Sequence, residues 1–217
     1  MPAQSLAAAR RPRPLLEAPE VSDDLRLIGP TRVFGRDEAI FDEGDGVDSV
    51  YRVVSGGVRA LRLLADGRRQ IIGFHLPGDI FGLELGERRR GSAEALGETT
   101  LLIARRASLG AEPGQAERLW RVSLAALERS QDHVLTLGRR SACERVASFL
   151  LDLAGRLGAG GHFELPMSRL DIADHLGLTI ETVSRSLGQL QAGGLVRLDS
   201  CRRVRLPRPA ALAALCQ

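Results

Sequence analysis

The sequence predicts an α+β fold with three parts: an N-terminal antiparallel β-roll, a long helix and a C-terminal winged helix-turn-helix. Between residues 32 and 104, short runs rich in Val, Ile and Leu alternate with glycine turns at a spacing of about ten residues. Apolar residues then recur at the spacing of a single helical seam. After residue 168, two short amphipathic segments flank a glycine, which is typical of a helix-turn-helix.

The composition is that of an ordinary globular chain, with 217 residues of which 44% are hydrophobic and 26% charged. No apolar run approaches the ~18 residues that a membrane span requires. No apolar stretch follows the basic residues near the N-terminus, as a secretory signal would need. We therefore expect a cytoplasmic protein with no membrane partner. The net charge of +3 does not by itself indicate a nucleic-acid ligand.

Metal and cofactor sites are not indicated by the sequence. Cys143, Cys201 and Cys216 are far apart and form no CxxC pair, so neither a zinc nor an iron–sulfur site is expected. Reduced thiols are the expected state of cysteines in a cytoplasmic protein. A β-roll could also host a metalloenzyme, but His75 is the only histidine of the β region. We therefore predict no enzyme and no cofactor.

Residues 1–20 are predicted to be a disordered tail. They are rich in Ala, Arg and Pro, and Pro12, Pro14 and Pro19 exclude a stable helix there. We interpret this tail as a simple leader in preference to a basic arm that touches a ligand.

Residues 21–112 are predicted to form the β-roll. Strands are expected at about residues 49–54, 58–64 and 70–76. Asp66 and Gly67 lie between two of these runs and are a strong hairpin signal. Three consecutive arginines, at 88–90, could attract an anion, but a solvated loop is the preferred interpretation.

Residues 113–140 are predicted to be one helix, opened by Pro113, with a seam that needs a partner. The seam follows a 4-3-4-3 spacing and consists of Trp120, Leu124, Leu127, Gln131 and Val134. The rest of this helix is largely charged, which favours pairing with the same helix of a second chain. The alternative is that the seam packs on the chain's own β-roll. A glutamine in such a seam lowers stability but can fix register.

Residues 141–217 are predicted to be the winged helix-turn-helix. A first helix is expected over residues 142–157, with Val146, Phe149, Leu150 and Leu153 on one face. The pair Ser168 and Asp171 then marks the start of a short helix. Gly177 supplies the turn, and Thr179 can cap a second helix.

The outward row of this second helix points to DNA. Glu181, Ser184 and Arg185 lie on its N-terminal half, where helix-turn-helix proteins contact base edges in the major groove. Arginine can donate two hydrogen bonds to guanine, and glutamate can accept one from cytosine. Two strands at residues 195–199 and 201–206 would form the wing. Phosphate contacts are expected from Ser168, Arg169, Thr179, Thr182, Arg202 and Arg203.

Residues 25–206 resemble the CRP/FNR superfamily of bacterial transcription regulators. The resemblance rests on Glu43-Gly44-Asp45, on Val53-Val54-Ser55-Gly56, on Leu76-Pro77-Gly78-Asp79-Ile80-Phe81-Gly82 and on residues 144–150. The recognition segment at residues 180–185 is similar to the FNR and FixK type. The resemblance implies a β-roll like a cyclic-nucleotide-binding domain. It also implies a homodimeric activator that contacts RNA polymerase and reads a palindrome of TTGA-type half-sites in double-stranded DNA through Glu181, Ser184 and Arg185.

Departures from the family pattern concern the signal. The chain has no cysteine before Cys143, although the iron–sulfur proteins of the family carry most of theirs near the N-terminus. The phosphate-binding residues of the cyclic-AMP receptors are out of register in the turn at residues 81–84 and in the segment at residues 90–92. We therefore expect action without cyclic nucleotide or cluster. The alternative is a regulator gated by cyclic nucleotide or haem, although His75 and His133 each stand alone. Oxidation of Cys201 on the wing is conceivable, but an inert thiol is preferred.

Overall fold

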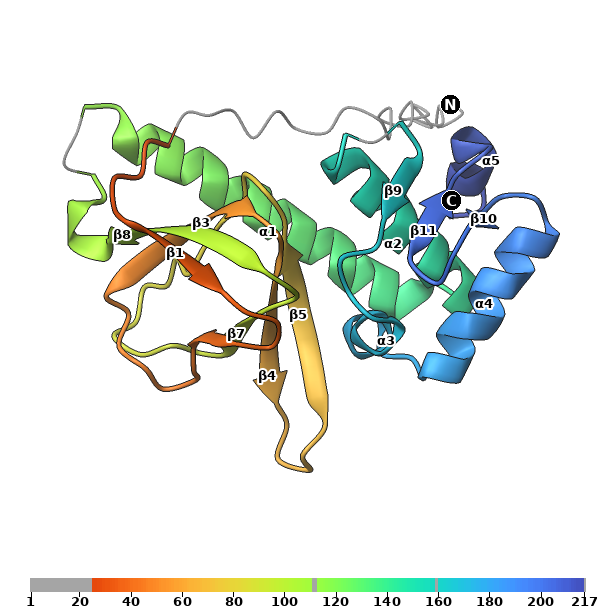
Figure 1. Ribbon diagram of the computed structural model, residues 1–217, viewed down its shortest axis with the longest axis horizontal. Helices are drawn as coiled ribbons and strands as arrows, with labels where there is room; N and C mark the ends of the chain where they lie inside the picture. Colours follow the sequence, from red (N-terminus) through yellow and green to blue (C-terminus); the bar gives the residue numbers. More distant parts are fainter. Residues whose placement is uncertain (1–24, 111–112, 159, 217) are drawn as a thin grey trace, which may run out of the picture.

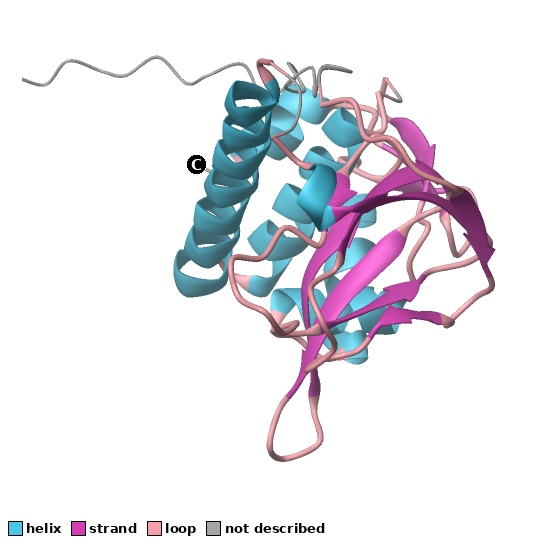
Figure 2. Cartoon of the chain, turned by 90° about the vertical axis from the view of Figure 1, so that its left-hand side faces the viewer, coloured by secondary structure: helices cyan, strands magenta, loops and turns pink. Residues whose placement is uncertain are grey.

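The computed structural model describes residues 25–110, 113–158 and 160–216, so the predicted tail at residues 1–20 lies outside the described residues. The β-strands of the N-terminal part and the helices of the C-terminal part are connected by α1 (Gln115–Arg139), which crosses from one to the other (Figure 1). Figure 2 shows that the helices gather on one side of the strands of the roll. The predicted α+β architecture is confirmed.

Two antiparallel sheets of four strands each make the β-roll. The first has the order β1 (Thr31–Phe34), β8 (Thr99–Arg105), β3 (Ser49–Ser55), β6 (Ile80–Phe81). The second has the order β2 (Ala39–Phe41), β7 (Ser92–Ala95), β4 (Val58–Leu63), β5 (Arg69–His75). Buried apolar side chains of both sheets, such as Val53 and Val58, form one core between them. The three predicted strands are confirmed to within a residue at their ends.

The β4–β5 hairpin turns at the predicted position. Leu63 of β4 pairs with Arg69 of β5, and the backbone nitrogen of Gly67 donates to the Leu64 carbonyl at 2.9 Å. Gly67 has a φ of +81°, a conformation that a side chain at this position would strain. The glycine therefore allows the tight connection that the sequence indicated.

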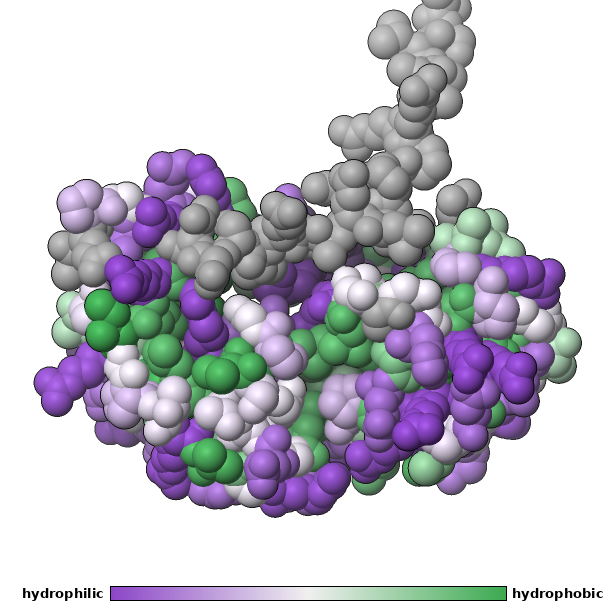
Figure 3. All heavy atoms as spheres, turned by 45° about the horizontal axis from the view of Figure 1, so that its top comes forward, coloured by the Kyte–Doolittle hydropathy of each residue, from purple (hydrophilic) through white to green (hydrophobic). Residues whose placement is uncertain are grey.

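One side of α1 packs on the roll, and its predicted seam does not. Leu119 and Val122 contact a buried cluster that includes Leu25 and Val50. The five seam residues all remain exposed in the single chain, with Trp120 at 64% and Val134 at 65%. The alternative of a seam buried on the chain's own roll is therefore not what the structure shows. Figure 3 shows hydrophobic surface patches interspersed with hydrophilic ones on the face turned forward.

The C-terminal part packs four helices around a core that extends to apolar residues of the β-roll, among them Ile71 and Phe74. They are α2 (Ala142–Arg156), α3 (Arg169–Leu176), α4 (Ile180–Ala192) and α5 (Pro209–Ala214). The predicted face of α2 is buried, and Leu150 lies in one core cluster with Ile172 and Val183. A three-stranded sheet of order β10 (Arg197–Leu198), β11 (Arg203–Arg205), β9 (His162–Glu164) completes this part.

The two wing strands are shorter than predicted. Residues 195–199 and 201–206 were expected, but the ladder contains only Arg197–Leu198 and Arg203–Arg205. The Leu195 nitrogen donates to the Leu190 carbonyl, which ties it to the end of α4. At the tip, the Ser200 hydroxyl accepts hydrogen bonds from the nitrogens of Arg202 and Arg203. Such local side-chain bonds compete with strand pairing, which explains the shorter ladder.

Aromatic and histidine rings fill the junction between the roll and the helical part. The His175 ring stacks on His133 with centroids 4.1 Å apart, and its Nδ1 lies 3.1 Å from the Ile71 carbonyl. Phe74 of β5 meets both His175 and Phe149 edge to face. Burial, followed by the charge of His133, lowers the pKa of His175 from 6.5 to about 4. Burial likewise lowers the pKa of His75 to about 4. Both histidines are therefore neutral in the folded protein at neutral pH.

We predict that stability falls as the pH drops from about 6.5 to about 4. Unfolded chains bind protons at both histidines in this window and the folded state does not, so the free energy of unfolding decreases. Burial lowers the pKa of His133 as well, so it adds to the same decrease. His175→Gln removes one of these protons and should give a shallower decrease. Urea unfolding at several pH values measures both slopes. The exposed His162 supplies the control variant His162→Gln, and a His175→Gln slope equal to that of wild type would contradict the assignment.

Candidate nucleic-acid interface

Side-chain caps define the two helices of the helix-turn-helix as the sequence predicted. Ser168 and Asp171 form a capping box at the start of α3, in which each side chain accepts a hydrogen bond from the other's backbone nitrogen. Gly177 ends α3 with a φ of +62°. The Thr179 hydroxyl then accepts from the Thr182 nitrogen at 3.2 Å and starts α4. These caps set the length of the turn and the position at which α4 begins.

The three predicted base-reading residues lie on the outer side of the first half of α4. Glu181 and Arg185 are exposed, and Ser184 is half-buried. The three lie on one side because residues three and four apart share one face of a helix. Val183 lies on the opposite side and is fully buried. Glu181 accepts a hydrogen bond from its own backbone nitrogen and another from Thr179, and these lower its pKa, as does the charge of Arg185. The row therefore presents a carboxylate acceptor, a hydroxyl and a guanidinium donor.

The structure joins one predicted phosphate residue to the base-reading row. Nη1 of Arg169, on α3, donates to the Ser184 hydroxyl on α4 at 3.3 Å. Along α4, Nη2 of Arg185 donates to the Thr182 hydroxyl at 3.3 Å. The hydroxyls of Ser168 and Thr179 serve as helix caps, a role that sequence reasoning assigned in addition to phosphate contact. The hydrogen bond between Arg169 and Ser184 thus brings the first turn of α3 against the first half of α4.

The wing carries its arginines in two environments. Asp199 forms ion pairs with both Arg197 and Arg205, so this carboxylate offsets part of the positive charge of the wing. Arg203 is exposed on β11, and Arg202 is half-buried at the tip. Within the described residues, no ion pair engages either of these two guanidinium groups. Sequence reasoning assigned no role to Asp199, although an aspartate between two arginine-bearing strands was a visible signal.

The interior of the β-roll contains a buried arginine that the sequence analysis placed in a solvated loop. Arg88 and Arg90 are exposed, but the Arg89 side chain is only 1% exposed. Its Nη1 donates to the Gly82 carbonyl at 2.8 Å, and its Nη2 donates to the Ser49 carbonyl at 2.6 Å. The solvated-loop interpretation is wrong at this position, because the guanidinium lies inside the roll and two backbone carbonyls accept hydrogen bonds from its Nη atoms. Its buried Nε has no hydrogen-bond partner among the described residues.

The surroundings of Arg89 are also engaged by the chain itself. The guanidinium lies 4.2 Å from the centroid of the Phe41 ring, and Glu84 lies 3.5 Å from its Nη1. The other oxygen of Glu84 accepts a hydrogen bond from the Arg90 nitrogen at 2.9 Å. The Ser92 hydroxyl accepts one from the Glu43 nitrogen at 3.0 Å. Glu84 and Ser92 therefore have partners within the chain, whereas the buried Nε of Arg89 does not.

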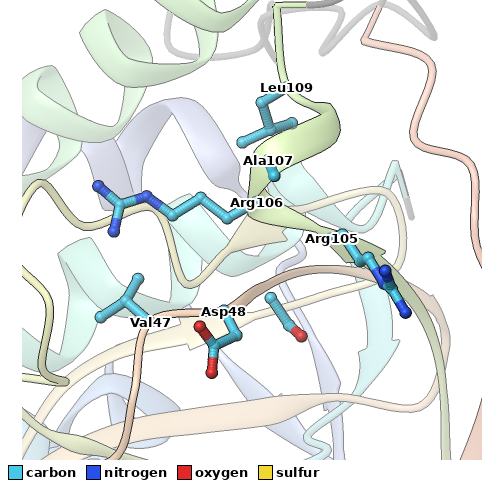
Figure 4. A pocket seen from close by; sticks show the side chains of 7 residues that line it. Val47, Asp48, Arg105, Arg106, Ala107 and Leu109 are labelled. Carbon is cyan, nitrogen blue, oxygen red and sulfur yellow. The ribbon is translucent and has the colours of Figure 1, made fainter.

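The remaining surface offers no converging set of ligand groups in the described ranges. A shallow, open pocket of about 670 Å³ is lined by residues that include Asp48, Arg105 and Arg106. Figure 4 shows that its two arginines extend in opposite directions. The guanidinium of Arg106 donates to the carbonyls of Leu85 and Gly86. Among these residues, no group of three or more His, Cys, Asp or Glu side chains could hold a metal ion, and no helix is long and apolar enough to cross a membrane.

Two domain models match the chain and together span most of the described residues. Residues 31–111 match a cyclic nucleotide-binding domain, and residues 144–215 match a Crp-like helix-turn-helix domain. The first match covers the β-roll, and the second covers α2 through α5.

Known proteins with the same organisation are similar to this chain over most of its length. The nitrogen fixation regulation protein FixK of Azorhizobium caulinodans is 50% identical over 87% of this chain and 79% of its own. The transcriptional activatory protein AadR of Rhodopseudomonas palustris is 42% identical over 83% of this chain and 80% of its own. The structure of FixK2 from Bradyrhizobium japonicum superposes with a TM-score of 0.83 at 44% identity, covering 87% of this chain and 98% of that one. The expectation of a regulator rather than an enzyme is thereby confirmed. The chain belongs to the CRP/FNR family of DNA-binding transcription regulators and lies close to FixK.

Proposed function

We propose that this protein is a homodimeric transcription activator that binds a palindrome of TTGA-type half-sites without cyclic nucleotide or iron–sulfur cluster. The observation that carries the proposal is the outward row of Glu181, Ser184 and Arg185 on the first half of α4. In helix-turn-helix proteins this half of the second helix enters the major groove. A regulator of this kind acts where the DNA is, which places it in the cytoplasm.

Base recognition follows from the chemistry of the row. Arg185 can donate two hydrogen bonds to O6 and N7 of guanine, and Glu181 can accept from the amino group of cytosine. The lowered pKa of Glu181 keeps it an acceptor at neutral pH. Ser184 would meet a base edge or a phosphate from between them, held by its hydrogen bond with Arg169.

Phosphate contacts would fix the register of the protein on the duplex. The exposed Arg203 and the half-buried Arg202 place positive charge on the wing. Arg169, Ser168, Thr179 and Thr182 lie at the starts of α3 and α4, where free backbone nitrogens favour anions. Such contacts raise affinity and salt dependence but carry no sequence information.

Dimerisation is supported by the exposed seam of α1. Trp120, Leu124, Leu127 and Val134 present an apolar stripe with Gln131 among them, and the same stripe on a second chain would cover it. A two-fold dimer would place two α4 helices about one DNA turn apart (~34 Å), which matches a palindrome.

Independence from a cyclic nucleotide is supported by contacts that polar and charged side chains of the roll make within the chain. The Arg89 guanidinium already lies against Phe41, and Glu84 and Ser92 bond to the chain itself. The match of residues 31–111 to a cyclic nucleotide-binding domain favours the alternative, a ligand-gated regulator. Activation is supported by the similarity to AadR, whose name describes a transcriptional activator, and contact with RNA polymerase is the proposed route.

The proposal predicts that the purified, ligand-free protein prefers a TTGAT-N4-ATCAA duplex to a scrambled duplex by about 10³-fold or more at ~150 mM salt. Fluorescence anisotropy measures both affinities. Preference that arises only after addition of cyclic AMP, cyclic GMP or haem would establish the ligand-gated alternative. Equal weak binding to both duplexes under all conditions would contradict the half-site.

Arg185→Ala should weaken binding to the palindrome by about 1–3 kcal/mol and relax specificity at one base pair. Arg203→Ala should weaken palindrome and scrambled duplex about equally, with a salt slope smaller by about one. Anisotropy titrations over a range of salt concentrations separate the two effects. If Arg185→Ala weakens both duplexes alike, its assignment as a base-reading residue is wrong.

Leu127→Arg should convert a dimer to a monomer, because it places a charge in the centre of the proposed α1 interface. Sedimentation equilibrium of the free protein measures the mass. The matched control is Leu85→Arg, since Leu85 is a fully exposed leucine outside α1. A Leu127→Arg protein with the same association as wild type would exclude this face of α1 as the interface.

A further inference from the structure

The carboxylate of Asp171 is shared between two tasks. Its Oδ2 accepts from the backbone nitrogen of Ser168 at 2.9 Å and from the hydroxyl of that serine at 2.6 Å, which completes the cap of α3. Its Oδ1 pairs with Arg69 at 2.8 Å and with Arg59 at 3.4 Å, and both arginines belong to the β-roll. The Asp171 side chain is only 5% exposed. The cap of a helix-turn-helix is therefore bonded directly to the other part of the molecule.

The two arginines are held differently. Arg59 on β4 also pairs with Glu94 at 2.6 Å and Asp37 at 2.8 Å, so acidic residues of the roll fix its position. Arg69 at the start of β5 has all its ion pairs with α3, to Asp171 and to Asp174, both at 2.8 Å. Within the described residues, Arg59 is thus fixed by acidic residues of the roll, whereas Arg69 connects the roll to α3.

Further polar contacts run along the same edge. The Gln70 side chain donates to the Asp174 carbonyl at 2.7 Å, and His175 bonds to the Ile71 carbonyl at 3.1 Å. At the other end of β5, Arg156 of α2 pairs with Asp79 at 2.6 Å. Hydrogen bonds and ion pairs of this kind are directional, so they define a position as well as an attraction. Strand β5 and helix α3 are consequently held in a fixed position relative to each other (Figure 1).

The same helix is linked to the base-reading row. Arg169 follows the cap residue Ser168 directly and donates to Ser184 on α4. Ile172 of α3 and Val183 of α4 belong to one buried core cluster, which also includes Ile71 and Phe74 of β5. Because α3 packs directly against α4, a shift of α3 would carry α4 with it, and the polar contacts of Arg69 add direction to the apolar packing on β5.

We infer that Arg69, supported by Arg59, is a positioning residue for DNA recognition that acts through Asp171 and Asp174. It holds α3, and hence α4, at a fixed place relative to the roll and to α1. In the proposed dimer this place determines whether both α4 helices meet successive major grooves, so the inference rests on the proposed function. Loss of Arg69 leaves the longer contact to Arg59 as the remaining ion pair of the buried Asp171, beside its two hydrogen bonds from Ser168.

The test uses Arg69→Met in the full-length protein, with Arg68→Met as the matched control. Arg68 is the neighbouring residue, is 77% exposed and pairs with Asp66 inside the hairpin. Hydrogen–deuterium exchange of the free protein should show faster exchange in α3 for Arg69→Met only, while the strands of the roll stay protected. Affinity for the palindrome should fall about tenfold for Arg69→Met, within the usual range of coupling between sites, and stay unchanged for Arg68→Met.

A conservative variant separates positioning from stability. Arg69→Lys keeps the charge and one contact, so its exchange and affinity should lie between those of wild type and Arg69→Met. Should Arg69→Met fail to fold, Asp174→Asn removes one of the two ion pairs from a half-buried site and should show the same two changes more weakly.

Three results would overturn the inference. The first is that α3 exchanges equally fast in Arg69→Met and Arg68→Met. The second is that α3 exchanges faster in Arg69→Met while its affinity for DNA is unchanged. The third is that the loss of affinity equals the loss expected from the fraction of unfolded protein. Failure of the proposed function is distinguishable, because wild type itself would then bind palindrome and scrambled duplex alike. The exchange experiment needs no DNA and would still decide whether Arg69 holds α3 against the roll.

Discussion

The polar contact between the β-roll and the helix-turn-helix centres on one buried carboxylate that two parts of the chain share. A charge as enclosed as that of Asp171 is tolerated only when it is fully paired. Four donors meet this need: the nitrogen and hydroxyl of Ser168 on one oxygen, and the guanidinium groups of Arg59 and Arg69 on the other. Local helix capping and long-range domain contact therefore satisfy the same group. A change in the cap or in the contact between the parts therefore alters the charge environment of the same carboxylate.

A second buried charge has a comparable role inside the β-roll. Arg89 is enclosed among carbonyl oxygens, aromatic faces and Glu84. The roll, which matches a cyclic nucleotide-binding domain, therefore contains a buried cation of its own. A guanidinium in this place packs the interior and orders the turn at Gly82. These contacts are made within the chain itself, which agrees with the proposed independence from a small ligand.

Local signals in the sequence were sufficient for much of the fold and of the DNA-contact site. The caps at Ser168 and Thr179, the turn at Gly177 and the outward row on α4 depend on residues within four positions of one another. The burial of Arg89 and the ion pairs of Asp171 could not be predicted, because their partners lie far away in the sequence. The third wing strand, β9, was also missed, since three residues are too few for a periodic pattern.

The uncovered stripe on α1 has a consequence for how such a protein could be controlled. If a second chain closes this stripe, the DNA-competent species forms in a bimolecular step, so at low concentration its amount rises with the square of the chain concentration. A modest rise in synthesis would then produce a disproportionate rise in occupied promoters. If no small ligand acts on the roll, mass action itself would serve as the input, and the rate of synthesis of the chain as the signal.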